Sequence, residues 1–385
     1  MYIPTRILFG AGELNNLHKQ EMPGRKALLV ISSGRSTRAN GYLARTEEQL
    51  AKAGVAWTVF DRIEANPLKS TVMEGAAAAR RNGCDLIVAL GGGSVMDASK
   101  AIALMAANDG DLWDYVGTGT GLGKPFGRHP LPVVAITTTA GTGSEVDPWG
   151  VVTNDVTHEK IGIGIEATFP VLAVVDPELM LSVPPRLTAY QGFDALFHSV
   201  EGYISRFANP MSDMYALTAV ENIGRHLATA VRNGNDPEAR AKIAFGNTLS
   251  GVVMCVSVTS SQHSLEHAMS AFHQELPHGA GLIMLSRAYF SFMIDKHVCD
   301  ERFVRMARAM GMEEARRPED FIAALTALQQ ACGVADLKMS DYGIVPDEFG
   351  KLAANARETM PGLFLADRYE LTPDDCIAIY RAAYR

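Results

Sequence analysis

Residues 85–104, DLIVALGGGSVMDASKAIAL, join an apolar run to three glycines and then to a stretch with helical periodicity. Glycines at such a turn let a phosphate group approach the backbone closely, and Ser94 with the amino end of the helix offers it hydrogen-bond donors. The segment therefore predicts a buried strand, a phosphate-binding turn and a helix. Its spacing differs from the fingerprint G-x-G-x-x-G, and a glycine run after a strand is also compatible with a simple tight turn.

The alternation of strand and helix extends over the first half of the chain. Apolar runs that favour strands recur at residues 27–31, 56–60, 85–90 and 132–137. The stretches between them are amphipathic, and residues 69–82 have a helical period. Strands that alternate with helices form a parallel sheet covered by helices. We predict a dinucleotide-binding α/β domain over residues 1–184.

The second half of the chain has a different texture. After Pro184 and Pro185 it consists of long stretches rich in Ala, Leu and Met, which favour helices. The predicted helices span residues 194–203, 212–233, 237–251, 264–272, 279–295, 300–310, 318–332 and 373–384. We predict an all-helical domain over residues 185–385.

A second polar turn follows another predicted strand. Residues 133–146, VVAITTTAGTGSEV, place threonines and a serine, including Thr137, Thr138 and Ser144, between small residues. Hydroxyl groups of this kind can hydrogen-bond phosphate oxygens and an amide. Ligands of open α/β sheets bind at the carboxyl ends of the strands, where both turns are predicted to lie. The two turns together indicate a nucleotide site.

The charge of the chain argues against a nucleic-acid partner. The 385 residues include 35 Lys and Arg against 43 Asp and Glu, a formal net charge of −8. The basic residues form no block that could neutralise a phosphate backbone. A content of 47% hydrophobic and 20% charged residues is that of a globular protein.

The cysteines and the amino terminus predict a cytoplasmic location. Five widely spaced cysteines without a CxxC pair indicate reduced thiols rather than a disulfide framework. Residues 1–14, MYIPTRILFGAGEL, lack the pattern of a signal peptide, and no segment reaches the length of an uncharged membrane span.

Two histidine-containing stretches in the second half indicate a metal site. In GFDALFHSVEGYISR, residues 192–206, Asp194 and His198 are four apart and share a helix face. Residues 262–281, QHSLEHAMSAFHQELPHGAG, contain four of the ten histidines. One such pair alone is more often a structural hydrogen bond, but this clustering is hard to explain by packing. One carboxylate with three neutral imidazoles suits Fe²⁺ or Zn²⁺ acting as a Lewis acid.

Not every histidine of the second stretch is needed as a ligand. An Asp and three His already complete a catalytic set, so His267 and His273 are each expected to be non-ligands. His267, one turn after His263, could instead relay protons.

The motifs GGGSVMDASK, TTTAGTGSEV, GFDALFHSVEGY and HSLEHAMSAFHQELPHG resemble, in order and spacing, the iron-containing (group III) alcohol dehydrogenase family. The resemblance extends over nearly the whole chain, from FGAG at residues 9–12 to the last helix. It implies a dehydroquinate synthase-like fold, with an α/β dinucleotide-binding domain and an all-helical domain. It also implies that metal and nicotinamide meet in a cleft.

The resemblance assigns roles to individual residues. It places Asp194, His198, His263 and His278 at metal-ligand positions and His267 at a catalytic position for substrate or proton relay. The predicted cofactor contacts are Asn66, Gly93, Ser94, Asp97, Thr137, Thr138, Ser144 and Lys160.

One departure from the family pattern concerns the fourth ligand. The interval from His263 to His278 is one residue longer than in common members, and His273 lies within it. We prefer His278 because its PHG setting matches the family.

Another departure concerns the choice of cofactor. After the first predicted strand, where many NAD-preferring members have an aspartate, this chain has Ser32, Ser33, Gly34, Arg35 and Ser36. An aspartate would repel a 2′-phosphate, whereas Ser33 and Arg35 would accommodate one. The cofactor is predicted as NAD(P)(H), slightly favouring NADP(H), although Arg35 is also compatible with an ordinary solvated loop residue.

The predicted activity is transfer of a hydride between NAD(P)(H) and a small alcohol or aldehyde. A maleylacetate-type reductase, a polyol dehydrogenase and a synthase of the related sugar-cyclising group are alternatives on the same fold, and a non-catalytic nucleotide or metal sensor is a distant one. Trp149, Phe197, Met254 and Phe272 are apolar candidates for a substrate pocket, or else core residues. Family members are often dimers or larger, so a homo-oligomer is expected.

Overall fold

The computed structural model describes residues 1–385, which separate into two compact units. The α/β unit consists of Tyr2–Thr139 and Ser144–Ser182. The helical unit consists of Met1, Ala140–Gly143 and Val183–Arg385. The short segment Ala140–Gly143 thus belongs with the helices, although it directly follows a strand of the sheet.

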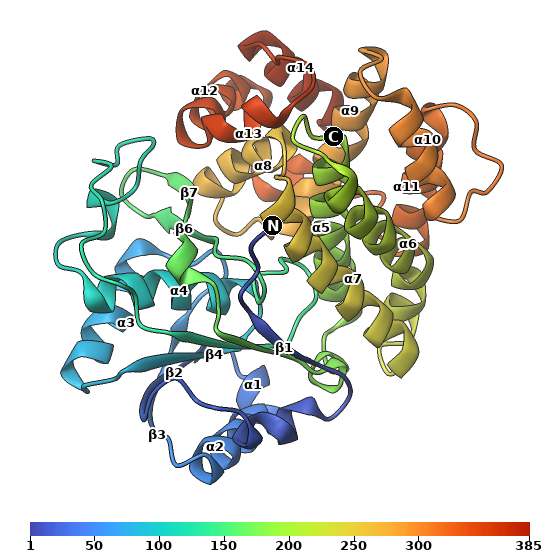
Figure 1. The fold of residues 1–385 in the computed structure, drawn as a ribbon. Coiled ribbons are helices and arrows are strands. Elements are labelled where there is room, and N and C mark those ends of the chain that lie inside the picture. The colour runs from blue at the N-terminus through green and yellow to red at the C-terminus, as the bar shows by residue number, and fades with distance from the viewer. The chain divides into compact units, whose positions relative to one another are not determined.

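The α/β unit is built on a six-stranded parallel sheet with strand order β1-β8-β5-β4-β2-β3 (Figure 1). Its strands are β1 (Arg6–Phe9), β2 (Lys26–Ser32), β3 (Ala56–Ile63), β4 (Leu86–Gly91), β5 (Val133–Thr137) and β8 (Leu172–Val175). The chain runs from β2 outward to β3 and then returns to place β4 on the other side of β2. This reversal is a topological switch point, the place where open α/β sheets bind ligands.

Both faces of the sheet are covered. Alternate residues of a strand point to opposite faces, so Leu28 and Val30 pack with α3 and α4, whereas Leu29 and Ile31 pack with η1 and α2. The helices of this unit are η1 (Glu13–Lys19), α1 (Ser36–Ala39), α2 (Tyr42–Lys52), α3 (Lys69–Arg81), α4 (Gly93–Ala107), η2 (Leu112–Asp114), η3 (Glu166–Thr168) and η4 (Pro177–Met180).

The sequence prediction omitted four strands of this unit. Strands β1 and β8 are only four residues long, and β1 lies at the sheet edge with exposed side chains, so it lacks a buried apolar run. The other two, β6 (Gly150–Asn154) and β7 (Glu159–Ile163), pair with each other as a separate antiparallel hairpin. An alternation of strands with helices does not signal such a hairpin.

The helical unit contains ten α-helices. They are α5 (Pro185–Ile204), α6 (Pro210–Arg232), α7 (Pro237–Val256), α8 (Ser261–Phe272), α9 (His278–Asp295), α10 (Asp300–Ala309), α11 (Glu319–Ala331), α12 (Phe349–Thr359), α13 (Pro361–Ala366) and α14 (Pro373–Ala383), with the short turns η5 (Met339–Tyr342) and η6 (Pro346–Glu348). The predicted fold class, a parallel α/β domain followed by an all-helical domain, is confirmed.

Proline and capping residues explain where several of these helices begin. Helix α5 starts at Pro185 rather than at Asp194 as predicted, because proline is well suited to the first helical position. The Asn209 side chain accepts hydrogen bonds from Met211 N and Ser212 N at the start of α6. Helices α12 and α13 were not predicted.

All five cysteines are free, as their number and spacing predicted. No single helix is long and apolar enough to cross a membrane. One pair, α7 with α8, has the required length and composition only when the two are taken together, and it is bent by 107°.

Candidate functional site

Helix α5 carries the first half of a buried polar group. Asp194 and His198 lie one turn apart on a helix that is buried almost throughout, and His198 Nδ1 lies 3.6 Å from Asp194 Oδ1. Glu201 follows on the same face and is fully buried. Three ionisable side chains on the buried face of one helix need partners from neighbouring elements.

Those partners come from α8 and from the first residue of α9. His263 Nε2 lies 3.6 Å from Asp194 Oδ1, and His278 Nε2 lies 3.5 Å from the same oxygen. Asp194, His263 and His278 can each direct a ligand atom so that the three atoms lie within 4.8 Å of one another. His278 reaches the group because Pro277 ends the preceding turn and α9 begins at His278.

Two atoms of this group have unmet bonding capacity. Asp194 Oδ1 and His263 Nε2 are buried, and neither has a hydrogen-bond partner. Leaving buried polar atoms unpaired is costly, so this pattern marks a place where a further group binds. A carboxylate oxygen and imidazole nitrogens are ligands that Fe²⁺ and Zn²⁺ both accept. The residues present therefore fit a divalent transition-metal ion.

His198 lies beside this group of three. Its ring stacks on that of His263 with centroids 4.5 Å apart, and its Nδ1 lies 3.3 Å from the carbonyl oxygen of Gly141. When Nδ1–H donates to that carbonyl, Nε2 retains the lone pair that a metal ligand needs. The sequence-predicted ligands Asp194, His198, His263 and His278 are thus neighbours in the helical unit.

The charges of the group follow from burial and from one another. Burial lowers the pKa of His198 to about 3, so its imidazole is neutral at neutral pH. Burial raises the pKa of Asp194, but the histidines around it outweigh burial and hold that pKa well below its usual value. Burial lowers the pKa of His263, but Glu201 and Asp194 outweigh burial and raise it to about 10. The ring of His263 thus lies between two carboxylates, with Glu201 at its Nδ1 and Asp194 on the side of its Nε2.

Two buried glutamates that were not predicted from the sequence contact the histidines. His263 Nδ1 lies 2.6 Å from Glu201 Oε1, and His278 Nδ1 contacts Glu266 Oε2. Both glutamates are fully buried. The available signal was their spacing, since Glu201 lies two turns after Asp194 and Glu266 lies one turn after His263.

The two remaining histidines of this stretch have different surroundings. His267 is buried, its ring centroid lies 5.2 Å from that of His278, and its Nδ1 lies 2.8 Å from the Met360 sulfur. His273 instead pairs with Glu348 through Nε2 at 2.5 Å. His273 is therefore absent from the group around Asp194, whereas His278 belongs to it.

In the α/β unit, the two predicted turns are adjacent. Strands β4 and β5 pair side by side and end in register, with Gly91 opposite Thr137. Gly92 is the N-cap of α4, and Gly93 and Ser94 are the first residues of that helix. A Cβ on Gly92 would lie only 2.7 Å from Thr139 Oγ1. The two turns therefore approach each other more closely than a residue with a side chain at position 92 would allow. Thr138 N donates to the Gly91 carbonyl, which links the turns directly.

Two of the predicted cofactor residues participate in a network inside the unit. Ser144 Oγ lies 2.7 Å from Asp97 Oδ1 and 2.6 Å from Lys100 Nζ. Lys100 also donates to Asp147 at 3.0 Å, and the other Asp97 oxygen accepts from Val151 N. Asp97 and Ser144 therefore fix the start of the β6–β7 hairpin against α4.

The other predicted cofactor residues occupy two places. Lys160 on β7 donates to Asn66 Oδ1 at 3.0 Å, and Asn66 has a left-handed backbone with φ of 52°. Asparagine tolerates this conformation better than most residues. Ser33 and Arg35 follow β2 at the switch point, and both are exposed.

The apolar pocket candidates separate into different environments. Phe197 is fully buried between Phe193 and Phe290, with ring centroids 5.8 Å from each, so it is a core residue. Phe272 contacts the ammonium of Lys351, which lies 3.7 Å from its ring centroid. Trp149 is exposed and Met254 is half-buried.

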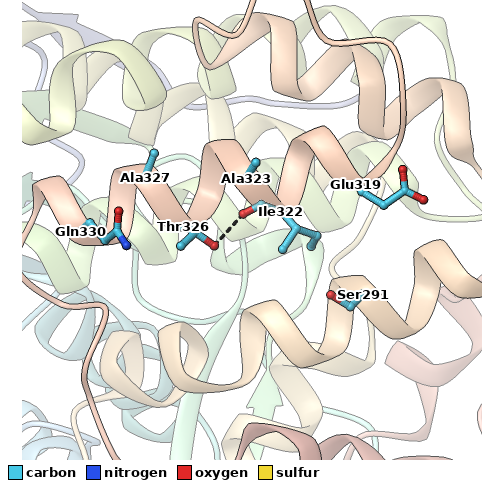
Figure 2. A pocket seen from close by; sticks show the side chains of 7 residues that line it. All are labelled: Ser291, Glu319, Ile322, Ala323, Thr326, Ala327 and Gln330. Carbon is cyan, nitrogen blue, oxygen red and sulfur yellow. Dashed lines mark hydrogen bonds between the residues drawn. The ribbon is translucent and has the colours of Figure 1, made fainter.

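A groove between α9 and α11 contains none of the predicted site residues (Figure 2). Its volume is about 580 Å³, and Thr326, which lines it, donates its hydroxyl to the Ile322 carbonyl of its own helix. The lining offers no titratable pair and no orphaned buried atom, so the candidate site remains the histidine group.

Comparison with known sequences identifies the family. The family described as iron-containing alcohol dehydrogenase matches residues 4–177, and its C-terminal domain matches residues 188–384. The 1,3-propanediol dehydrogenase of Klebsiella pneumoniae is 33% identical, over 99% of this chain and 98% of the relative. The NAD-dependent methanol dehydrogenase of Bacillus methanolicus is 32% identical, over 93% of each chain.

Comparison with solved structures agrees. An archaeal halo-thermophilic alcohol dehydrogenase from a Red Sea brine pool has a TM-score of 0.94 and 31% sequence identity, over 99% of this chain and 98% of the other. The chain belongs to the iron-containing alcohol dehydrogenase family. It is an enzyme of the oxidoreductase class, as its sequence motifs predicted.

Proposed function

We propose that this protein is an iron(II)-dependent alcohol dehydrogenase and aldehyde reductase that uses NAD(P)(H) and acts on small alcohols or aldehydes. The observation that carries the proposal is the convergence of His263 Nε2 and His278 Nε2 on Asp194 Oδ1, with Asp194 Oδ1 and His263 Nε2 buried and without a hydrogen-bond partner. Asp194, His198, His263 and His278 are the proposed ligands.

The two bound groups supply chemistry that side chains lack. The divalent ion acts as a Lewis acid toward the alcohol oxygen, and the nicotinamide accepts or donates the hydride. The ligand set has one negative charge, so a divalent ion held by it retains net positive charge. Zn²⁺ suits the same ligands, so metal content is part of the test.

His267 is the proposed proton relay. It is buried and lies one helical turn after His263, near His278 but with its Nδ1 against Met360. An imidazole can accept a proton at one ring nitrogen and donate one from the other, which suits a group that passes the alcohol proton toward solvent.

The nucleotide is proposed to bind the α/β unit at the ends of β2, β4 and β5. Glycine turns before a helix bind phosphate through backbone N–H groups. Gly93, Ser94, Thr137 and Thr138 are the proposed contacts from the adjacent turns, Asp97 and Ser144 hold those turns in place, and Asn66 and Lys160 form a linked pair nearby.

A preference for NADP(H) is the finer proposal, and it rests on Ser33 and Arg35 alone. Relatives named as NAD- or NADH-dependent, from Bacillus methanolicus and Bacillus subtilis, favour the opposite preference. An Arg35→Ala variant should lose affinity for NADPH more than for NADH if Arg35 contacts the 2′-phosphate. Equal losses would assign Arg35 to the solvated loop and leave the enzyme as an NAD(H) user.

The deciding experiment is anaerobic reduction of a panel of short aldehydes by Fe²⁺-loaded protein, followed at 340 nm with NADH and NADPH in parallel. Turnover that requires Fe²⁺ supports the proposal. Turnover with Zn²⁺ alone would reassign the metal. Activity confined to maleylacetate or to polyols would favour those alternatives, and tight cofactor binding without turnover on any substrate would favour a sensor.

We also propose a homo-oligomer, on the evidence of β1. This strand lies at the sheet edge, where Ile7 and Phe9 are 38% and 41% exposed. An edge with exposed apolar side chains favours pairing with another chain. Sedimentation of wild type and of an Ile7→Lys variant tests the homo-oligomer, because a monomeric wild type would contradict the proposal.

We propose a cytoplasmic location on the evidence of the five free thiols, and cell fractionation tests it.

A further inference from the structure

Two of the histidines proposed as metal ligands each have a buried carboxylate on the far side of the ring. His263 and His278 direct Nε2 toward Asp194 Oδ1, at 3.6 and 3.5 Å, while their Nδ1 atoms contact Glu201 and Glu266. A carboxylate only accepts hydrogen bonds, so each Nδ1 must carry the proton. The tautomer that leaves Nε2 free for a metal is thereby fixed on both rings.

Glu201 also determines where His263 stands. Its Oε1 accepts from His263 Nδ1 at 2.6 Å, and its Oε2 accepts from Ser260 N at 2.8 Å and from Ser260 Oγ at 3.0 Å. Ser260 is the N-cap of α8, and His263 lies in the first turn of that helix. One fully buried side chain from α5 thus fixes both the ring orientation of His263 and the start of the helix that carries it.

Space for Glu266 is provided by Gly281 on α9. A Cβ on Gly281 would lie 2.7 Å from Glu266 Cγ and 2.8 Å from its Oε1. Because Glu266 is fully buried, its side chain has little room to move aside. The absence of a side chain at Gly281 therefore lets the carboxylate of α8 reach the ring of His278 at the start of α9.

We propose that Glu201 and Glu266 are positioning residues of the metal centre, each holding one ligand histidine through its Nδ1–H. This inference rests on the metal site proposed above. Outer carboxylates that orient ligand histidines typically contribute 10- to 100-fold to metal affinity. Neither glutamate needs to touch the ion or the substrate, so the effect should appear in metal binding before it appears in catalysis.

The test measures Co²⁺ affinity of the full chain by competition with a chromophoric chelator, and records the ligand-field absorption of the cobalt protein. Glu201→Ala and Glu266→Ala should each lower affinity by about 10- to 100-fold. Glu201→Gln should also lose affinity, because an amide oxygen accepts for only one of the two donors, His263 and Ser260, and its NH₂ group faces the other. In each variant the cobalt spectrum should change as the ring loses its fixed orientation.

A second variant tests Glu266 without removing it. Gly281→Ala keeps the carboxylate but displaces it, so it should lower Co²⁺ affinity. Gly350→Ala is the matched control, because it is also a helical glycine of the same unit, with no atom within 4 Å of the added Cβ. Ser260→Ala removes only one donor to Glu201, the hydroxyl, and leaves His263 Nδ1–H and the Ser260 N–H bonded to it, so its loss of affinity should be smaller than that of Glu201→Ala.

The outcomes separate this inference from the metal site itself. A wild type that binds no Co²⁺ or Fe²⁺ would contradict the metal site. The positioning role alone would be overturned by a different result. In that case the wild type binds Co²⁺, and the Glu201→Gln and Gly281→Ala proteins match its Co²⁺ affinity within twofold and its cobalt spectrum. An equal loss of affinity in the Gly350→Ala and Ser260→Ala controls would also overturn it, because the losses would then follow general destabilisation.

Discussion

At the scale of single residues, histidines of the same stretch have different environments. His263 and His278 lie in the polar group with Asp194, whereas His273, which falls between them in the sequence, is paired with Glu348 outside that group. A short sequence segment therefore contains both proposed ligands and a histidine with a different contact. The contrast supplies a matched pair of substitutions.

We predict that His198→Ala abolishes turnover at saturating cofactor, whereas His273→Ala retains it within a few fold. Removing one of four ligands leaves an incomplete set, and loss of the His273–Glu348 pair affects only a partly buried contact. Initial rates and iron content of both proteins are the measurements. Full activity and a normal iron content in the His198→Ala protein would show that His198 is not a metal ligand.

His267 has a different expected signature. We predict that His267→Ala lowers kcat by about 10²- to 10⁴-fold, the usual contribution of a proton-transferring side chain, while iron content stays at the wild-type level. Loss of iron along with activity would instead assign His267 to metal binding.

Spacing in the sequence predicted which ligand side chains would gather, because residues four apart on a helix share a face. It did not identify Glu201 and Glu266, since a buried glutamate becomes meaningful only when the ring that it faces is known. Those rings come from other positions, with Glu201 on α5 facing a histidine of α8. The spacing places each glutamate on the face of a ligand in its own helix, but the ring that each contacts depends on packing between helices, which no local pattern specifies.

At the scale of elements, β4, β5 and α4 meet at the two turns proposed to bind phosphate. Gly92 lies against Thr139, and the two turns are joined by the hydrogen bond from Thr138 N to Gly91 O. Two neighbouring strands thus end in one compact surface of small residues and hydroxyls.

We predict that Gly92→Ala weakens NAD(P)H binding at least tenfold while Co²⁺ affinity is unchanged, because the new Cβ would lie 2.7 Å from Thr139 Oγ1 and must push the two turns apart. Isothermal titration with each ligand checks this. Thr139→Ala in the same chain removes the clashing atoms and should recover part of the loss. Unchanged cofactor affinity in Gly92→Ala would place the nucleotide elsewhere.

Strands were predictable where they are long apolar runs and not where they are short. Strands β2, β4 and β5 are buried apolar runs between turn residues, and the sequence located all three. Strand β8, LAVV, is equally buried but only four residues long, and β1 is an exposed edge. Their pairing is set by partners far away in the chain, as when Arg6 pairs with Leu172.

At the scale of the whole molecule, buried ionisable groups link stability to pH. Asp367 is 3% exposed, its Oδ1 accepts from Tyr289 OH at 2.9 Å, and its Oδ2 has no hydrogen-bond partner. Burial raises the pKa of Asp367 to about 7. In the unfolded chain an aspartate has a pKa of about 3.9.

The sign of the effect follows from these two pKa values. Below about pH 4 the carboxyl is protonated in both states, so it contributes no pH dependence. Between about pH 4 and pH 7 the unfolded chain releases the proton first, so the free energy of unfolding falls as pH rises. Above about pH 7 both states are ionised and the loss is complete, at most about 4 kcal/mol for a shift of three pKa units.

We therefore predict that Asp367→Asn, which keeps an oxygen for Tyr289 but cannot ionise, gains stability relative to wild type as pH rises from about 4 to 7. Urea unfolding of metal-free protein at several pH values measures the difference in free energy of unfolding between the variant and the wild type. Groups that titrate alike in both proteins cancel in this difference.

Asp320→Asn should show the opposite pH dependence, because backbone N–H groups of Arg317 and Arg316 lower the pKa of Asp320. That variant should be less stable than wild type at pH 7, with the difference vanishing as pH falls through the carboxylate range. A difference between Asp367→Asn and wild type that is independent of pH would mean that Asp367 is ionised in the folded protein throughout, with a counter-charge that its observed contacts do not supply.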